Sequence, residues 1–541
     1  MIVQHSPEAD VEDPGGWLRA QWSDLLAVPV TTTPGADPDF FALGGDSLRA
    51  ARLAARMRKA GFAGIALTDV IDNRRFAQQV ELLRAAATRE AAPAPMSTQR
   101  YEMSAAQQNR VAMVAERLRA GQRPPPLSIH TVLALHGPID PAALHRAARA
   151  LLDRHPALRT TFLTEDFQER VLVRPVPGNW GPAVHDFTGL PVAEARRRAR
   201  AIAHSQHDTL FDFVEPPLLA VSLCLVSADE ALLAVTVDHL VSDGVSTFVL
   251  WRDLTALYDA ETRRMPAGLP ELSVSSQELL GSREAAWQAQ RASLLEAWDG
   301  ALAGYDAAPQ CDLVDPDRAE EFHPPQPAEH HGQELPAAVV REFRAACLAA
   351  EVTEHAAVVG LVFAALHALD GRTDAVVCTA QSGRFTEAEE NLVGWLSDRV
   401  IVRVLGESGD PLRCVRAAQE RLRFAYRNPV PYHVLVRRYQ GTVGGRSPRK
   451  PYIFVNYTDA PLTGRTFGPA AAEEVVDPAP HTSFPGPGVL VARDGDRMTI
   501  ELSTVAGRYP EGLVARFGEQ LIAAFRGFAA TAAPAAEEAR A

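Results

Sequence analysis

Lysine is nearly absent from this chain, since Lys59 and Lys450 are the only two among 541 residues. A pyridoxal-phosphate enzyme needs a lysine amine for its Schiff base, so this scarcity disfavours that class of enzyme. Cysteine is also scarce, and the five cysteines are odd in number, far apart and without a CxxC pair. They are Cys224, Cys311, Cys347, Cys378 and Cys414. We therefore expect reduced structural thiols, no disulfide framework and no metal site.

Long apolar runs and an excess of positive charge are missing as well. No uninterrupted apolar stretch approaches the about 18 residues of a membrane span, and the first residues do not form a basic segment followed by an apolar one. We expect no membrane contact and a cytoplasmic location. The formal net charge is −13 and no basic cluster contains interleaved aromatic residues, so we expect no nucleic-acid partner.

The sequence divides into a small helical part and a larger mixed part. Residues 1–85 carry apolar side chains at helical spacing and predict an all-α bundle of four helices. Its predicted helical segments lie near residues 17–26, 48–61 and 76–83, with a short turn at 67–71. Residues 86–98 are rich in alanine and proline, lack a periodic apolar face, and are predicted to be a linker.

Beyond residue 98, strand-like and helical runs alternate, which predicts sheets covered by helices. The pattern occurs twice, so we expect an N-terminal lobe over residues 99–265 and a C-terminal lobe over residues 266–530. The proline-punctuated stretch from Met265 to Ser273 joins the two lobes in this prediction, and residues 531–541 are predicted to be a flexible tail.

Two short strings carry most of the chemical information. LGGDSL places Ser47 between a glycine loop and a predicted helix, where glycines permit close approach of a modifying enzyme and a helix N-terminus favours a phosphodiester. DHLVSDGVS follows a predicted strand whose alternation places Asp238 and His239 on opposite faces.

The first string resembles the attachment site of a peptidyl carrier protein, and the second resembles the active-site loop of a nonribosomal peptide condensation domain. Further strings are similar to condensation-domain motifs and occur in the order of that family. They are SAAQQNR (104–110), GPID (137–140), RHPALRTTF (154–162), SGR (382–384), VGWLSDRVIVRV (393–404), NPVPYHVLV (428–436) and YIFVNY (452–457). The resemblance implies a four-helix carrier bundle followed by an α/β condensation domain. The condensation domain would consist of two chloramphenicol-acetyltransferase-like lobes arranged as a V around a tunnel.

The resemblance also implies a prosthetic group and partners. Ser47, with Asp46 beside it in the attachment motif, would carry 4′-phosphopantetheine installed by a phosphopantetheinyl transferase. Because the sequence shows no adenylation domain, a separate adenylation enzyme would load the arm. The acceptor would be a downstream carrier protein or a small-molecule amine, and we expect a monomer. Two alternatives are a helix-capping serine and a hydrolase of the GDSL type, whose DxxH is only approximated by Asp477 and His481.

Within the second string, His239 is the candidate catalytic residue. It would orient an attacking amine and accept its proton, while the backbone N–H of Gly244 at the start of a predicted helix is a candidate oxyanion donor. The alternative for His239 is a buried core histidine. The resemblance pairs Asp243 with Arg384 as a structural ion pair, and a dyad of Asp243 with His239 is the alternative.

Three further positions of the site are expected to be structural or to differ from the family pattern. Ser246 and Asp238 are expected to be structural, and Asp238 stands where most condensation domains have histidine. Asp398 replaces a neutral residue of the family's tunnel strand. It would hold a cationic acceptor amine, be neutralised by Arg399 or Arg403, or be a solvated strand end.

The predicted function is amide formation between an acyl thioester on the Ser47 arm and an amine acceptor, as in antibiotic and other secondary-metabolite biosynthesis. One alternative is an acyltransferase that forms an ester with a soluble hydroxyl acceptor. The other is a non-catalytic recruitment domain, a class that typically loses the HxxxDG residues found here at 239–244.

Overall fold

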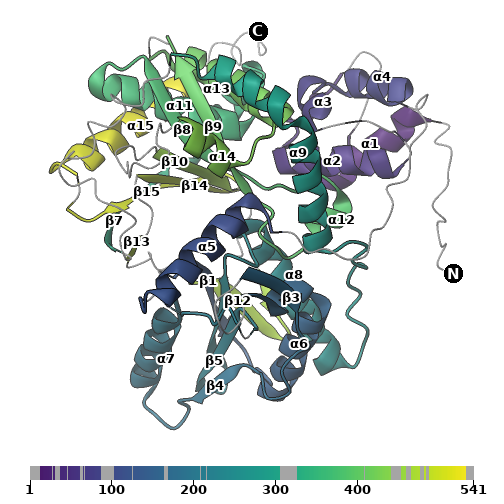
Figure 1. Cartoon of the computed structure of the whole chain (residues 1–541), viewed down its shortest axis with the longest axis vertical. Coiled ribbons are helices and arrows are strands. Elements are labelled where there is room, and N and C mark those ends of the chain that lie inside the picture. The colour runs from purple at the N-terminus through teal and green to yellow at the C-terminus, as the bar shows by residue number, and fades with distance from the viewer. Residues whose placement is uncertain are drawn as a thin grey trace.

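The computed structural model describes residues 13–26, 28–30, 37–45, 47–60, 62, 65, 67–86, 103–122, 124, 126–163, 169–207, 209–214, 216–304, 326–406, 409–439, 453–458, 465–475, 481–482, 487–507 and 509–531. The predicted linker beyond Ala86, the predicted tail beyond Thr531 and Cys311 lie outside these residues. In Figure 1 a small helical bundle lies beside two larger units, each built around a sheet.

Four helices form the N-terminal bundle, and they enclose a core of their own. They are α1 (Pro14–Leu26), α2 (Ser47–Lys59), α3 (Leu67–Asp72) and α4 (Phe76–Ala86). Trp22 is fully buried at the centre, and its indole N–H donates to the side chain of Gln79 at 3.0 Å. The short turn predicted at 67–71 is helical, because Val70 on α3 completes the apolar core.

The N-terminal lobe contains a six-stranded sheet in the order β11-β12-β1-β6-β5-β4. Its strands are β1 (Ser128–His136), β4 (Ala183–Asp186), β5 (Leu219–Ser227), β6 (Glu230–Asp238), β11 (Arg465–Phe467) and β12 (Ala470–Glu474). Alternating side chains of β1, β5 and β6 pack on α6 (Pro141–Arg154) and α8 (Gly244–Arg263) on one face. The opposite face packs on α7 (Val192–His207), so both faces of this sheet are covered.

Smaller elements complete this lobe. They are α5 (Ala105–Arg119), the 3-10 helix η1 (Pro156–Arg159) and the two-stranded sheet of β2 (Thr160–Leu163) and β3 (Glu169–Val173). Ser104 and Gln107 form a capping box at the start of α5, which defines where this helix begins.

The C-terminal lobe contains a seven-stranded sheet in the order β13-β7-β15-β14-β10-β8-β9. Its strands are β7 (Gln326–Leu335), β8 (Asp374–Gln381), β9 (Asp398–Leu405), β10 (Ile453–Thr458), β13 (His481–Thr482), β14 (Gly488–Asp494) and β15 (Arg497–Val505). Its helices are α9 (Ser276–Ala301), α10 (Ala337–Ala349), α11 (Glu354–Asp370), α12 (Glu387–Glu390), α13 (Pro411–Arg427), α14 (Tyr432–Tyr439) and α15 (Leu513–Ala530).

The two lobes exchange chain. β12 pairs with β1 in an antiparallel register, with Leu135 opposite Ala472, so residues 465–474 belong to the N-terminal sheet. The prediction that residues 266–530 lie wholly in the C-terminal lobe is therefore wrong for this segment. Figure 1 shows β12 beside β1 in the N-terminal lobe.

Helix α11 lies at the centre of the C-terminal lobe, and every residue from Ala356 to Leu366 is buried. Among the described residues, no single helix is long and apolar enough to cross a bilayer. Helices α10 and α11, which meet at an angle of 102°, together reach the length and apolar composition of a span, but by length and composition alone.

Candidate active site

The turn that carries His239 connects the last central strand of the N-terminal sheet to α8. Strand β6 ends at Asp238, and the backbone N–H of His239 donates to Leu127 O at 2.9 Å. Helix α8 begins at Gly244, with Asp243 as its N-cap. Strand pairing on one side and a capped helix on the other therefore hold the five intervening residues.

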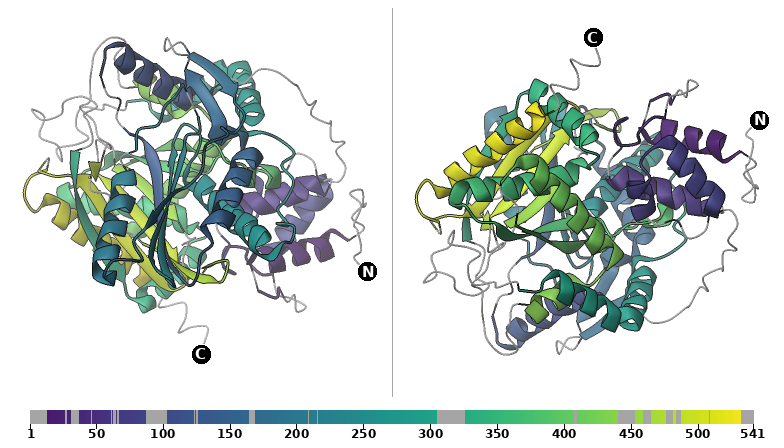
Figure 2. Two further views of the ribbon diagram at one scale, coloured as in Figure 1. Left: turned by 90° about the horizontal axis from the view of Figure 1, so that it is seen from below. Right: turned by 90° about the horizontal axis from the view of Figure 1, so that it is seen from above.

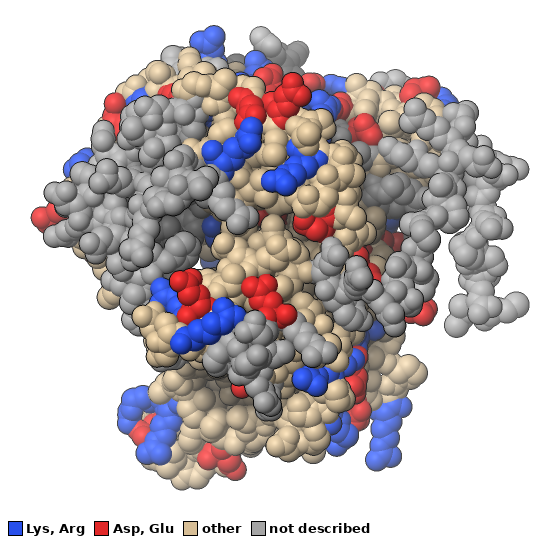
Figure 3. Space-filling view, viewed as in Figure 1, with Lys and Arg blue, Asp and Glu red and all other residues tan. Residues whose placement is uncertain are grey.

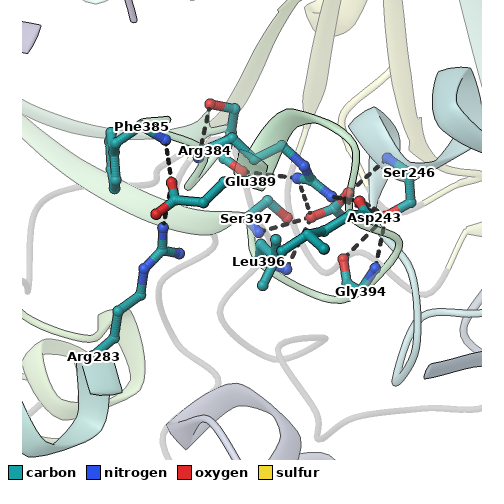
Figure 4. Close-up of polar contacts among 11 residues, drawn as sticks. Asp243, Ser246, Arg283, Arg384, Phe385, Glu389, Gly394, Leu396 and Ser397 are labelled. Carbon is teal, nitrogen blue, oxygen red and sulfur yellow. Dashed lines mark hydrogen bonds and ion pairs between the residues drawn. The ribbon is translucent and has the colours of Figure 1, made fainter. Parts of the chain in front are cut away.

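Asp243 and Arg384 form a fully buried ion pair across the two lobes (Figure 4). Arg384 donates from Nη1 to Asp243 Oδ2 at 2.8 Å, and the backbone N–H groups of Leu396 and Ser397 donate to the same oxygen at 2.9 and 2.8 Å. The other oxygen, Oδ1, accepts from both the backbone N–H and the hydroxyl of Ser246 at 2.8 Å. Both carboxylate oxygens are thus occupied, Oδ1 by Ser246 of α8 and Oδ2 by the C-terminal lobe.

The electrostatics of Asp243 agree with this structural role. Burial opposes its ionisation, but the guanidinium of Arg384 and the N–H and O–H donors hold the pKa of Asp243 below its ordinary value. The hydrogen bonds of Asp243 among the described residues all go to groups other than His239. This geometry favours the predicted ion pair over a dyad with His239.

Ser246 holds the C-terminal segment against α8. Its hydroxyl accepts from the backbone N–H of Gly394 at 3.1 Å and from Arg384 Nη2 at 3.0 Å. A side chain at Gly394 would collide with Ser276 at the start of α9, which explains the glycine there. The sequence indicated a structural Ser246 but not its contact with Gly394, because that contact joins residues 148 positions apart.

His239 packs against an aromatic ring from the other lobe. The ring centroids of His239 and Trp395 lie 4.4 Å apart at an interplanar angle of 50°. Burial lowers the pKa of His239, so the imidazole is neutral near pH 7. Its Nδ1 atom is buried, and no other residue that the structure describes hydrogen-bonds it. Sequence analysis missed Trp395, although it lies within the VGWLSD string.

The side chain of Asp238 is buried beneath the turn. Its Oδ1 accepts from Leu240 N at 2.9 Å, and burial raises the pKa of Asp238 to about 6 against the opposing charge of Arg110. Gln107 on α5 donates to Leu240 O at 2.7 Å. Helix α5 therefore steadies the turn through Gln107 and Arg110, two residues of the SAAQQNR string whose roles sequence analysis did not assign.

Gly244 lies at the open side of the turn. It is exposed, and a side chain placed there would meet no atom within 4 Å. As the first residue of α8, it lies at the positive end of a 20-residue helix. A neutral imidazole and a helix N-terminus therefore lie within one short turn, as general-base acyl transfer needs.

Asp398 serves the backbone of its own lobe. Its two oxygens accept from Arg399 N at 2.8 Å and from Tyr432 N, at the start of α14, at 3.1 Å. Burial raises the pKa of Asp398 to about 7. Of its two predicted neutralising partners, Arg399 supplies the charge that opposes this rise in pKa, whereas Arg403 pairs with Asp374 at 2.7 Å. The arrangement disagrees with a solvated strand end.

Ser47 is the first residue of the 13-residue α2, whereas Asp46 and the side chain of Ser47 lie outside the described structure. Gly44 adopts φ +99°, which favours glycine, and a side chain at Gly45 would collide with Phe40. These glycines turn the chain directly into α2, so that Ser47 lies at a positive helix end. The loop thus fits a phosphate ester on Ser47. Among the described residues, no cluster of potential metal ligands occurs.

Comparison with protein families gives two matches. The family described as "Condensation domain" matches residues 98–448, and the family described as "Phosphopantetheine attachment site" matches residues 16–83. The second match covers the α1–α4 bundle, and the first covers His239, Asp243 and Arg384.

Curated relatives are peptide synthetases. Phosphinothricin tripeptide synthetase PhsB of Streptomyces viridochromogenes is 29% identical over 434 residues, which cover 78% of this chain and 35% of that protein. Malpinin synthetase of Mortierella alpina is 27% identical over 74% of this chain and 5% of its own length. The chain thus spans about a third or less of these two relatives.

Solved structures share the fold. The first condensation domain of the calcium-dependent antibiotic synthetase matches with a TM-score of 0.61 and 19% identity, covering 80% of this chain and 97% of that one. The X-domain from teicoplanin biosynthesis, solved in complex with OxyB, matches with a TM-score of 0.63 and 21% identity, covering 82% and 96%.

Proposed function

Because this chain belongs to the condensation-domain family and carries a phosphopantetheine attachment domain before it, we propose that it forms an amide bond between an acyl group on the Ser47 arm and an amine acceptor. We further propose that its two lobes are the chloramphenicol-acetyltransferase-like pair of that family, with the acyl and acceptor groups meeting between them. The observation that carries the proposal is the turn at 239–244, where a neutral imidazole lies beside a helix N-terminus.

When attached, the arm supplies the acyl group as a thioester, whose thiol is the leaving group. An α-amino acceptor with a pKa of about 8 is partly neutral at pH 7, so it needs little general-base help before attack. His239 then orients the amine, and its neutral imidazole accepts the proton that the new amide nitrogen loses and passes it to the departing sulfur, which leaves as the thiol. The backbone N–H of Gly244 faces the carbonyl oxygen as negative charge develops there.

Three kinds of partner follow from this proposal. A phosphopantetheinyl transferase modifies Ser47, a separate adenylation enzyme loads it, and a carrier-bound or soluble amine accepts the acyl group. We propose that Asp398 affects acceptor binding indirectly, through the start of α14, since both of its oxygens already accept backbone N–H groups.

A non-catalytic recruitment role is the second candidate. It has specific support in the fold similarity to the X-domain, which is solved in complex with OxyB. The intact turn from His239 to Gly244 favours catalysis, because a docking domain needs no neutral imidazole held beside a helix N-terminus.

Intact-protein mass spectrometry tests the proposal. The chain is converted to its phosphopantetheine form, charged with a panel of acyl groups, and mixed with matched amine and alcohol acceptors. We expect loss of the acyl mass with amide product from amines. Ester product from alcohols alone would instead establish the acyltransferase alternative, and stable acyl-protein with every acceptor would favour recruitment.

A further inference from the structure

The helical bundle contacts the C-terminal lobe through charge pairs of opposite polarity. Arg52 of α2 lies 3.0 Å from Glu390 of α12, so the bundle contributes the cation. Asp72 at the end of α3 pairs with Arg423 of α13 at 2.9 Å and also with Arg427, so the bundle contributes the anion. Figure 2 shows the purple bundle at one side of the molecule in both views.

This arrangement specifies one orientation of the bundle. Two contacts of opposite sign on different helices can both form in only one alignment, and a bundle with the reverse charges would be repelled at both. On the face shown in Figure 3, acidic and basic side chains lie in mixed groups, so that neither sign forms a continuous stripe.

The Arg52 contact differs from an ordinary surface ion pair. The Glu390 side chain is only 15% exposed, and burial raises its pKa to about 7 against the opposing charge of Arg52. The Arg52 side chain is 41% exposed, so the pair lies at the edge of the contact, with the carboxyl as its buried partner. Loss of Arg52 therefore leaves the largely buried Glu390 carboxyl without its cation in the docked arrangement.

The helix that Arg52 contacts belongs to the segment that reaches the candidate active site. Arg384 precedes α12 and Leu392 follows it. Arg384 donates from Nη2 to Leu392 O at 3.0 Å, and this bond closes residues 384–392 into a loop that contains α12. Within α12, Glu389 pairs with Arg283 of α9 at 3.1 Å. Only five residues after Glu390, Trp395 packs on His239.

We propose that α12 and α13 form a docking site for the chain's own carrier bundle, that its charge order selects this bundle, and that docking steadies the loop that places Trp395 on His239. This inference rests on the proposed function for its catalytic consequence. The docking itself is independent of any chemistry.

Charge reversal in the full-length chain tests the docking site. The variants are Arg52→Glu, Glu390→Arg and the double variant that restores an ion pair with the charges exchanged. Small-angle X-ray scattering of the unloaded chain reports docking, and single-turnover acyl transfer reports its consequence. Each single variant should increase the radius of gyration and slow transfer about tenfold, whereas the double variant should recover to within about threefold of the parent.

A matched control and a second contact make the test specific. Glu261→Arg reverses the charge of one partner in the exposed Arg146–Glu261 pair of the N-terminal lobe. This control should leave the scattering and the transfer rate unchanged. If an α12 variant does not fold, the comparison is repeated at α13 with two variants. The first is Asp72→Arg alone, and the second combines it with Arg423→Asp and Arg427→Asp. Parent-like scattering of both Arg52→Glu and Asp72→Arg would overturn the docking site. If the single variants had a larger radius of gyration but neither the parent nor any variant transferred the acyl group, the docking site would stand and the proposed function would be contradicted.

Discussion

At the scale of single residues, two ionisable side chains of the turn at 238–244, Asp238 and His239, tend toward their neutral forms. Burial lowers the pKa of His239 and raises the pKa of Asp238, so in both side chains it favours the neutral form over the charged one. Neutral imidazole is the form that accepts a proton. The sequence pointed to His239 through its motif, but the pKa directions depend on packing by α5 and by Trp395, which only the fold brings close.

Replacement of Asp238 by asparagine should change the pH dependence of stability. The folded pKa of about 6 lies above the ordinary 3.8, so the stability contributed by Asp238 is present below about pH 4 and is lost as pH rises through about 6. Asp238→Asn keeps an acceptor for Leu240 N and removes this titration. The unfolding midpoint of the variant relative to the parent should therefore rise between pH 4 and 7. Parallel pH profiles would show that Asp238 does not titrate in this range.

Replacement of Trp395 should change how the rate depends on pH. Without the indole, water reaches the imidazole and the pKa of His239 returns upward toward its ordinary value. Asp243, which raises this pKa, and Arg399 and Arg110, which lower it, are unchanged. The acid limb of single-turnover transfer should move to higher pH in Trp395→Ala, with a rate about tenfold lower, while Trp395→Phe retains most of the parent behaviour. An unmoved acid limb in Trp395→Ala would mean that the indole does not shield His239.

At the scale of elements, the segment from Arg384 to Ser397 joins the lobes at the candidate active site. The Asp243–Arg384 pair and the bonds of Ser246 to Gly394 fasten it to α8. Sequence resemblance identified the ion pair because both partners lie in recognisable strings. It did not identify the role of the intervening α12, whose four residues carry no periodic pattern.

Removal of one partner of the Asp243–Arg384 pair should mainly affect folding. Asp243→Ala leaves a buried guanidinium and two backbone N–H groups without their acceptor, which costs about 3–5 kcal/mol by comparison with other buried pairs. Chemical denaturation measures this loss, with Glu261→Arg as an exposed-pair control. A variant as stable as the parent but inactive would favour the dyad of Asp243 with His239.

Other elements show why sequence patterns succeed or fail. Helix α6 carries strong local sequence signals, because Asp140 caps it, proline occupies its first turn and its apolar stripe is regular. Strand β12 was missed because AAAEE favours a helix, and only pairing with β1 makes it a strand. Helix α9 was missed because its buried residues form a narrow stripe of widely spaced positions.

At the scale of the whole molecule, a bundle with its own core contacts a two-lobed unit whose sheets exchange chain. Composition and alternation were enough to predict the bundle and the mixed α/β part. The crossing of residues 465–474 into the N-terminal sheet was not predictable in this way, because contacts between distant segments leave no local periodicity.

The carrier assignment predicts a single modification of the whole chain. Treatment with a phosphopantetheinyl transferase and coenzyme A should add one arm, on Ser47, because the glycine loop places that residue at the start of α2. Intact-protein mass spectrometry with peptide mapping measures it, and Ser47→Ala should show no mass increase. An arm on another serine would contradict the assignment.

The most direct measurement compares single-turnover amide formation by the acyl-loaded parent and His239→Ala, with Ser47 loading and thermal unfolding checked in both. We expect His239→Ala to load and fold like the parent and to form product roughly 10²-fold more slowly or worse, because orientation and proton acceptance are both lost. A fully loaded, folded His239→Ala that retains the parent rate within about threefold would contradict catalysis at this turn.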